Sequence, residues 1–263
     1  MKKVLITGGP TNEYIDEVMK ITNMSSGKIA IDLANIFAEN GYDTTLLLTK
    51  TIRHPLVDNI SSFKNCSVMR FETTKELYEI LEGLSDVEHD IIIHSAAVAD
   101  YKPEFSFRLE DMADEIAQYV HHHRDCHVDT IANDILHIMQ NPQCKVDDDT
   151  KISSVEPNLT VKLGLTPKII KNLRSWFPNA YICGFKLLEN VSEQELVDAA
   201  MKQLKSCNTN LVFANDLAEL RKGNMARLVV SQNKYNNIKV NGAEGIYRLL
   251  DILSKNTFSE VQS

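Results

Sequence analysis

The sequence predicts an α/β fold in which helices cover both faces of a mostly parallel sheet. Short apolar segments alternate with amphipathic segments along most of the chain, which is the pattern of repeated βα units. Several apolar segments carry hardly any polar residue, as parallel strands that are buried on both faces do. Cap and turn residues punctuate the alternation. Together these features predict a Rossmann-like, doubly wound sheet.

The elements are expected in the following order. Strands are predicted at residues 4–7, 44–49, 68–71, 90–94, 181–185 and 211–214. A helix over 27–40 has Ser25 or Ser26 as a candidate cap, and Gly41 stands just beyond its end. Thr166 and Pro167 are expected to cap and open a helix over 168–176, and a capping box at Ser192 opens another that runs to residue 205. Residues 227–231 and 238–240 are predicted to form an antiparallel C-terminal hairpin at a sheet edge, before a last helix over 243–255.

One segment interrupts the alternation, at about residues 104–150. It contains two helical patterns, at about 108–123 and 129–139, followed by an acidic run at 147–149. We interpret it as a helical insertion beside the site, mobile at its C-terminal end. The whole chain, 1–263, is otherwise expected to be a single Rossmann-like nucleotide-binding domain.

Composition and charge limit the function classes. Of the 263 residues, 43% are hydrophobic and 24% are charged, as in an ordinary globular protein, and no apolar run is long enough to cross a membrane. The net charge of −8 argues against nucleic-acid binding but permits a small anionic substrate in a local positive pocket. Five cysteines without a C-x-x-C pair indicate a cytoplasmic protein with reduced thiols.

Two glycine-containing segments are candidate anion sites. Residues 7–13 follow the first strand, and glycines there let main-chain N–H groups approach an anion, although the segment is neither a dinucleotide fingerprint nor a Walker loop. Residues 23–28 combine hydroxyls, a glycine and a helix N-terminus. Each segment taken alone is equally compatible with an ordinary turn or a serine cap.

Three further segments follow later strands or the insertion. Residues 96–101 carry small side chains and a carboxylate, Lys151 stands on a polar segment, and the segments 184–187 and 214–217 end two late strands. The small residues could admit a ligand against the backbone, a lysine could neutralise phosphates, and Phe185 with Asn215 could hold a base or ribose. The alternatives are a tight turn, a solvated lysine and a core phenylalanine.

In their order along the chain, these segments resemble the motif set of phosphopantothenoylcysteine synthetases. The motifs are T-x-G-x-T-x-E, N-x-S-S-G, A-A-V-A-D-Y, K-I-x-x, G-F-K-L and A-N-D, and they run from about Thr7 to Leu217. The resemblance implies a ligase of coenzyme A biosynthesis that joins L-cysteine to 4′-phosphopantothenate. It also implies Mg²⁺ with CTP or ATP as co-substrate, and a homodimer in which substrate reaches across the interface. The sequence does not decide between CTP and ATP.

The resemblance assigns roles to particular residues of this chain. It implies nucleotide contacts by Gly9, Ser25, Gly27, Phe185 and Asn215, and phosphopantothenate contacts by Asn23, Ala96, Ala97 and Asp100. Asp100 would reach the neighbouring subunit's ligand. Asn23 and Lys151 would be catalytic, Lys151 as the lysine of a mobile flap, and no protein residue is assigned to a metal.

The chain departs from the family pattern at three points. Ser154 stands where some members have a flap lysine, which leaves the identity of the working lysine open. Ala30 replaces a glycine of many members. No flavin-dependent decarboxylase domain accompanies the synthetase motifs.

The chemistry implied is acyl activation. The carboxylate of phosphopantothenate would attack the α-phosphate of the nucleotide and expel pyrophosphate, after which the amine of cysteine would open the acyl-nucleotide. Such displacements need electrostatic stabilisation and no protein nucleophile. The cysteines are therefore given no catalytic role.

Three alternatives remain beside the ligase. A short-chain NAD(P)-dependent oxidoreductase would have a similar fold, and Tyr235-x-x-x-Lys239 has the tyrosine–lysine spacing of such enzymes, although on a predicted strand. A zinc-binding regulator is suggested by the histidines at 121–123 with Cys126 and His127, but neighbouring residues do not give tetrahedral spacing. The third is a catalytically inactive nucleotide-binding homologue.

Overall fold

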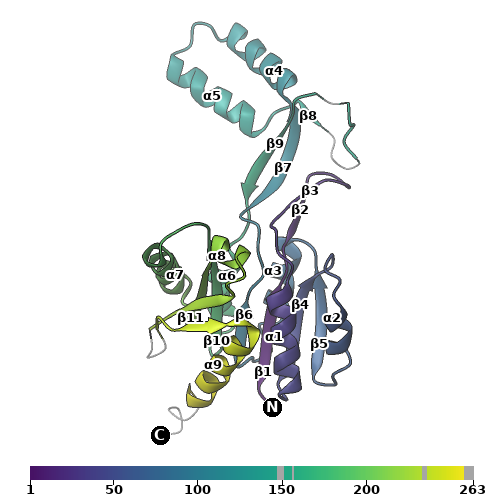
Figure 1. Cartoon of the computed structure of the whole chain (residues 1–263). Helices are drawn as coiled ribbons and strands as arrows, with labels where there is room; N and C mark the ends of the chain where they lie inside the picture. Colours follow the sequence, from purple (N-terminus) through teal and green to yellow (C-terminus); the bar gives the residue numbers. More distant parts are fainter. Residues whose placement is uncertain (147–150, 156, 233–235, 258–263) are drawn as a thin grey trace. The chain divides into compact units, whose positions relative to one another are not determined.

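The structure is a computed structural model that describes residues 1–146, 151–155, 157–232 and 236–257, and its backbone divides into two compact units (Figure 1). The first unit contains Met1–Thr11, Asn23–Val98 and the chain from Pro167 onward. The second contains Asn12–Thr22 and Ala99–Thr166. The expected insertion at 104–150 therefore lies within a larger unit, to which a hairpin near the N-terminus also belongs.

The first unit is built on an eight-stranded sheet in the order β13-β12-β11-β10-β6-β1-β4-β5. The strands are β1 (Lys3–Gly8), β4 (Asp43–Thr49), β5 (Cys66–Phe71), β6 (Ile91–His94), β10 (Tyr181–Leu188), β11 (Leu211–Asp216), β12 (Ala226–Ser231) and β13 (Lys239–Asn241). Those from β5 to β11 pair in parallel, and β12 and β13 are antiparallel. The predicted fold class and hairpin are confirmed.

The strand order reverses between the neighbouring strands β1 and β6. From β1 the chain continues to β4 and β5 on one side, and from β6 it continues to β10 and β11 on the other. In open α/β sheets, ligands bind outside the carboxyl ends of the strands at such a switch point. The loops that follow β1 and β6 contain Gly9 and Ala96–Ala97. The strand order therefore brings together two segments that the sequence singled out separately.

Helices cover both faces of this sheet. One face packs against α1 (Lys28–Glu39), α2 (Pro55–Ile60) and α9 (Gly242–Thr257), and the other against α3 (Thr74–Gly83), α6 (Ile169–Trp176) and α7 (Glu193–Cys207). A short α8 (Leu217–Arg221) follows β11. Buried strand residues alternate between the two faces: Val4 and Ile6 join the cluster with α1, whereas Leu5 joins the cluster with α3.

Helix starts were predicted with mixed success. The capping box at Ser192 is confirmed. The cap predicted for α1 is wrong: Gly27, in a left-handed conformation, occupies the N-cap position without a side-chain cap. The helix predicted over 168–176 is present as α6, but its predicted cap is wrong. Lys168 is the N-cap residue, and the Thr166 hydroxyl donates to the carbonyl of Ala99 instead.

The second unit is a small antiparallel sheet with a helical pair. In it, β7 (Tyr101–Arg108) lies between β8 (Lys145–Val146) and β9 (Leu159–Leu165), and β2 (Asn12–Tyr14) forms a hairpin with β3 (Lys20–Thr22). The two predicted helices are present as α4 (Leu109–His122) and α5 (Val128–Gln140), which pack side by side (Figure 1). The acidic run at 147–149, for which mobility was expected, lies outside the described residues. No helix among the residues that the structure describes is long and apolar enough to span a membrane.

Candidate functional site

Two glycines in left-handed conformations form the centre of the candidate site. Gly9 follows β1 with a φ of 85°, and Gly27 precedes α1 with a φ of 66°. A Cβ atom on Gly9 would lie 2.5 Å from Thr49 Oγ1, and one on Gly27 would lie 2.7 Å from Ile52 Cδ1 and 3.2 Å from the main-chain N of Gly9. The two backbones are thus in direct contact, with no room for side chains. Main-chain N–H groups beside a helix N-terminus are a site where anions bind.

The loop after β6 joins this centre through main-chain hydrogen bonds. The N–H of Ala97 donates to the Gly9 carbonyl at 2.9 Å, and the N–H of Thr11 donates to the Ala97 carbonyl at 3.3 Å. Pro10 and Ala97 form an isolated parallel bridge. The half-buried Ala96 and Ala97 therefore lie beside the glycine turn.

Asn23 ties the segment before α1 to the same loop. Its exposed side-chain amide donates to the carbonyls of Ala97 and Val98, at 3.2 and 3.1 Å. Ser25 lies nearby in sequence, and its Oγ accepts from the Gly27 N–H at 3.4 Å. The three segments that contain Gly9, Asn23–Gly27 and Ala96–Ala97 consequently converge on the switch point of the sheet.

A buried histidine beneath the loop was missed by the sequence analysis. His94 ends β6, and its Nδ1 lies 2.8 Å from the Thr7 hydroxyl, which also accepts from the Ala96 N–H at 3.3 Å. Ser95 Oγ donates to the Thr7 carbonyl at 2.7 Å. Burial lowers the pKa of His94 to about 4, so its ring is neutral at neutral pH. The sequence carries no signal for this contact, because a histidine at the end of an apolar strand has no local pattern that names its partner.

Phe185 and Asn215 lie on the face of the sheet that α1 covers. Phe185 packs against the cluster that contains Phe213, with ring centroids 5.2 Å apart, and Asn215 stands two residues after Phe213 on the same face of β11. Both residues are near the carboxyl ends of their strands, where β1 also ends in the glycine turn. This placement is compatible with a base or ribose pocket. The next residue, Asp216, instead caps α8 by accepting from the N–H groups of Ala218 and Glu219.

The structure does not gather every predicted residue into one unit. Asp100 and Lys151 are exposed and belong to the second unit. Lys151 directly precedes the buried Ile152, whose N–H donates to Asp16 Oδ2 at 2.9 Å. Ser154, which stands where some members of the family have a flap lysine, is exposed.

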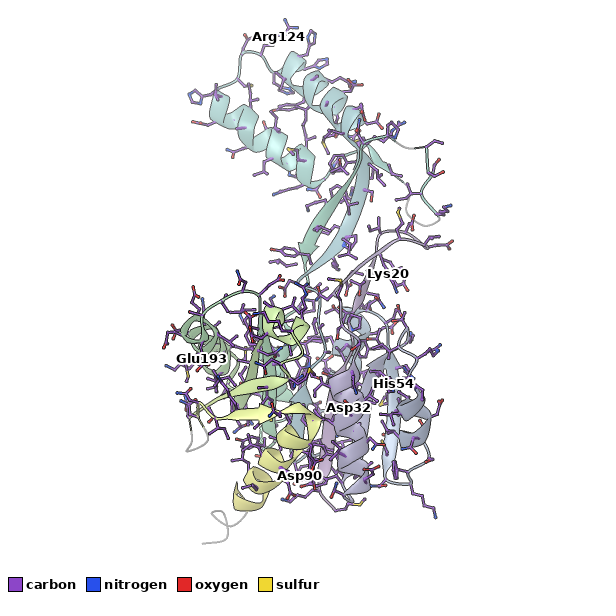
Figure 2. All side chains as sticks on the ribbon, viewed as in Figure 1. Lys20, Asp32, His54, Asp90, Arg124 and Glu193 are labelled. Carbon is purple, nitrogen blue, oxygen red and sulfur yellow. The ribbon has the colours of Figure 1, made fainter. Side chains whose placement is uncertain are left out.

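Lys28, of the N-x-S-S-G-K segment, makes an ion pair within its own helix. Its Nζ lies 2.7 Å from Asp32 one turn along α1, and Figure 2 labels Asp32 on that helix. The pair spans positions i and i+4 on an exposed surface, where such contacts add little stability.

The described residues behind the alternative interpretations make local contacts of their own. His122 and His123 contact main-chain carbonyls of their own helix, and the described residues contain no group of three histidine, cysteine or acidic side chains that could hold a metal ion. Tyr235 lies outside the described residues, and Lys239 pairs with Glu193 at 2.6 Å.

Two of the cysteines, Cys66 and Cys183, have the character of structural thiols. All five cysteines, which the described residues include, are free. Burial raises the pKa of Cys183 far above its usual range and that of Cys66 to about 11. Such thiols carry almost no thiolate at neutral pH and are poor nucleophiles.

Comparison with known proteins gives concordant matches. Residues 1–120 match the family model described as DNA/pantothenate metabolism flavoprotein C-terminal domain. The chain is 31% identical over 217 residues to the coenzyme A biosynthesis bifunctional protein CoaBC of Thermococcus kodakarensis, covering 82% of this chain and 41% of that protein. It is 29% identical over 242 residues to the protein of that name from Methanocaldococcus jannaschii, covering 92% and 47%. The chain thus spans less than half the length of either relative.

Solved structures extend the match across the chain. The DNA/pantothenate metabolism flavoprotein from Streptococcus pneumoniae is similar with a TM-score of 0.73 and 27% identity, over 98% of this chain and all of that one. A Cab2 mutant in complex with phosphopantothenate-cysteine shares the fold, with a TM-score of 0.67 and 19% identity, over 100% of this chain and 89% of that one. These matches confirm the resemblance that the motifs predicted: residues 1–120 belong to the family of the DNA/pantothenate metabolism flavoprotein C-terminal domain, and the similarity to known proteins extends over most of the chain.

Proposed function

We propose that the protein is a phosphopantothenate–cysteine ligase that uses CTP or ATP in coenzyme A biosynthesis. The observation that carries this proposal is the contact between Gly9 and Gly27 beside the Ala96–Ala97 loop, at the switch point of the sheet. The family and the names of the relatives support it. So does the phosphopantothenate-cysteine complex of a protein with the same fold.

The site residues divide between the two substrates. The nucleotide phosphates are held at Gly9, Ser25 and Gly27, where main-chain N–H groups and the N-terminus of α1 favour an anion. Phe185 and Asn215 contact the base or ribose. Phosphopantothenate lies against Ala96 and Ala97, with Asn23 fixing that loop, and Asp100 contacts the ligand of a neighbouring subunit.

The reaction proceeds in two displacements. A carboxylate oxygen of phosphopantothenate attacks the α-phosphorus, a P–O bond breaks, and pyrophosphate leaves. The amine of cysteine then attacks the acyl carbonyl, nucleoside monophosphate leaves, and the amine gives up a proton as the amide forms. Fixed N–H dipoles and the cationic Lys151 offset the charge on the phosphates. No protein nucleophile is needed, which agrees with the raised pKa values of Cys66 and Cys183.

Magnesium enters this proposal as part of the nucleotide substrate. Among the described residues no three candidate ligand side chains come together. A magnesium–nucleotide complex does not require such a cage, because phosphate oxygens and water supply most of the ligands. In this proposal the metal arrives with the nucleotide, and no protein ligand is assigned to it.

Pyrophosphate release tests the proposed function. The protein is incubated with Mg²⁺, phosphopantothenate, L-cysteine and either CTP or ATP, and the product is identified by mass. We expect sustained pyrophosphate release only when all components are present, and the nucleotide that supports it gives the preference. Absence of release with both nucleotides, for a protein that still binds one of them, would identify an inactive homologue.

We further propose that the ligase is a cytoplasmic homodimer. The proposal rests on the similarity of the A-A-V-A-D-Y segment to a loop that completes a neighbouring subunit's site. The hairpin of β12 and β13 is a candidate for part of the interface, because β13 lies at the edge of the sheet and edge strands are usually covered. Sedimentation velocity should give a dimer, and a monomer that keeps full activity on dilution would contradict the proposal.

A further inference from the structure

Asp16, in the turn between β2 and β3, has hydrogen bonds to two parts of the second unit that are distant in sequence. Its Oδ1 accepts from the N–H groups of Val18 and Met19, at 2.7 and 2.6 Å. Its Oδ2 accepts from the N–H of Ile152, 136 residues away, at 2.9 Å. The residue is only 4% exposed, so its charge is compensated by main-chain donors rather than by water. These hydrogen bonds, that of Met19 foremost, lower the pKa of Asp16 and keep it ionised.

The segment that follows Lys151 has one buried point. Among residues 151–155, Ile152 is 4% exposed, whereas the other four are exposed. The Asp16 carboxylate therefore binds the segment at its buried residue, directly after the lysine. The Asp16 carboxylate and the Lys151 ammonium also attract each other, which contributes to the lowered pKa of Asp16. Asp16 thus binds the main chain directly after Lys151 and also attracts the charge of the lysine.

We propose that Asp16 is a positioning residue for Lys151. By fixing the main chain at Ile152, Asp16 sets the position of the backbone that carries the lysine side chain. The inference rests on the proposed function, since Lys151 acts there as a cation in nucleotide activation. It adds a residue outside the motif segments that the sequence analysis identified, and it gives the β2–β3 turn a role in the reaction.

The main test is Asp16→Asn. The variant keeps one oxygen for Val18 and Met19 but replaces the acceptor for Ile152 with an NH₂ group that cannot accept. We expect kcat for pyrophosphate release to fall on the order of tenfold, as for loss of a buried charged acceptor. The KM for phosphopantothenate should change little. Glu17→Gln is the matched control, because it removes an equal charge from an exposed neighbour and should leave kcat unchanged.

A double-mutant cycle separates positioning from a purely structural role. If Asp16 acts through Lys151, Asp16→Asn should cost little further activity in a Lys151→Ala protein. A tenfold loss in both backgrounds would overturn the inference. Asp16→Glu retains the charge but displaces it by one methylene, and it should show the same coupling to Lys151 with a smaller loss of activity. It replaces Asp16→Asn in the cycle if the asparagine variant does not fold.

Hydrogen exchange gives a readout that does not depend on turnover. In Asp16→Asn, the amide of Ile152 should exchange at least several-fold faster, whereas amides in β7 and β9 should be unchanged. Unaltered exchange at Ile152 would show that Asp16 does not hold the segment. Failure of the proposed function itself would be seen separately, as a wild-type protein that releases no pyrophosphate.

Discussion

At the scale of single residues, two glycines with the same backbone conformation differ in what surrounds them. Gly27 and Gly41 have φ values of 66° and 80°, but only Gly27 is crowded by neighbouring atoms, whereas a Cβ on Gly41 would meet nothing within 4 Å. Alanine at either position should cost about 1 kcal/mol of stability through backbone strain. Only Gly27→Ala should also weaken nucleotide binding, because its methyl group would press against Ile52 and the Gly9 backbone.

Urea unfolding and nucleotide titration by calorimetry measure the two effects separately. Gly41→Ala is the control for strain without crowding. Equal nucleotide affinity in the two variants would show that the Gly9–Gly27 contact is not the phosphate site.

The buried His94 predicts a pH dependence of stability. Its pKa is about 4 in the folded protein and 6.5 in the unfolded chain, so the unfolded state binds the proton more readily. Its stabilising contribution is therefore complete above pH 6.5 and is lost as the pH falls toward 4, by up to about 3 kcal/mol. His94→Gln should flatten the fall in unfolding free energy between pH 6.5 and 4, relative to wild type. Parallel curves for the two proteins would contradict the assignment.

At the scale of elements, the loop after β6 depends on a tether from the segment before α1. Asn23 donates to the carbonyls of Ala97 and Val98, so Asn23→Asp would place a carboxylate against two carbonyl oxygens. We expect the loop to shift and the KM for phosphopantothenate to rise on the order of tenfold, since a hydrogen-bond donor is exchanged for a repulsive acceptor. Nucleotide affinity should change little. Separate calorimetric titrations of the two ligands check this, and equal losses for both would place Asn23 outside this role.

The elements that the sequence predicted well are those with a local signal. The apolar strands at 44–49 and 211–214, and the capping box at Ser192, are recognisable within a few neighbouring residues, and the structure has all three. The cap at Thr166 was mistaken because its hydroxyl bonds to Ala99, far away in sequence. A long-range partner for a cap residue leaves no local pattern.

The strands β7 and β9 were missed for a different reason. β7 contains Pro103, which argues against a strand, and β9 contains Gly164, which weakens one. Their register shifts between Pro103 and Phe105, and the buried residues of β7 are three consecutive ones, Phe105–Phe107, rather than an alternating set. The two strands stabilise each other by pairing between residues that are 51 to 64 positions apart in the chain. The sequence around either strand alone does not reveal this partner.

At the scale of the whole molecule, the strand order explains how the candidate site was predictable in part. Alternation of strands and helices predicted a doubly wound sheet, and such a sheet brings the loops after its strands to one edge. The segments around Gly9 and Ala97 are therefore neighbours, as their hydrogen bonds show. The bond from Ile152 to Asp16 belongs to a second unit assembled from two separate stretches of chain, and no periodicity predicts it.

Stabilisation by bound ligand distinguishes the ligase from the oxidoreductase and from the inactive nucleotide-binding homologue. A ligand that binds only the folded state at a hundred times its Kd stabilises that state by about 2.7 kcal/mol. For a chain of this size, that should raise Tm by roughly 5–10 °C. We expect CTP or ATP with Mg²⁺ to produce such a shift and NADPH to produce none.

The shift should be smaller in Gly27→Ala and retained in Gly41→Ala, because only the first crowds the glycine turn. A shift with NADPH alone would favour the oxidoreductase, and a nucleotide shift without pyrophosphate release would favour an inactive nucleotide-binding homologue.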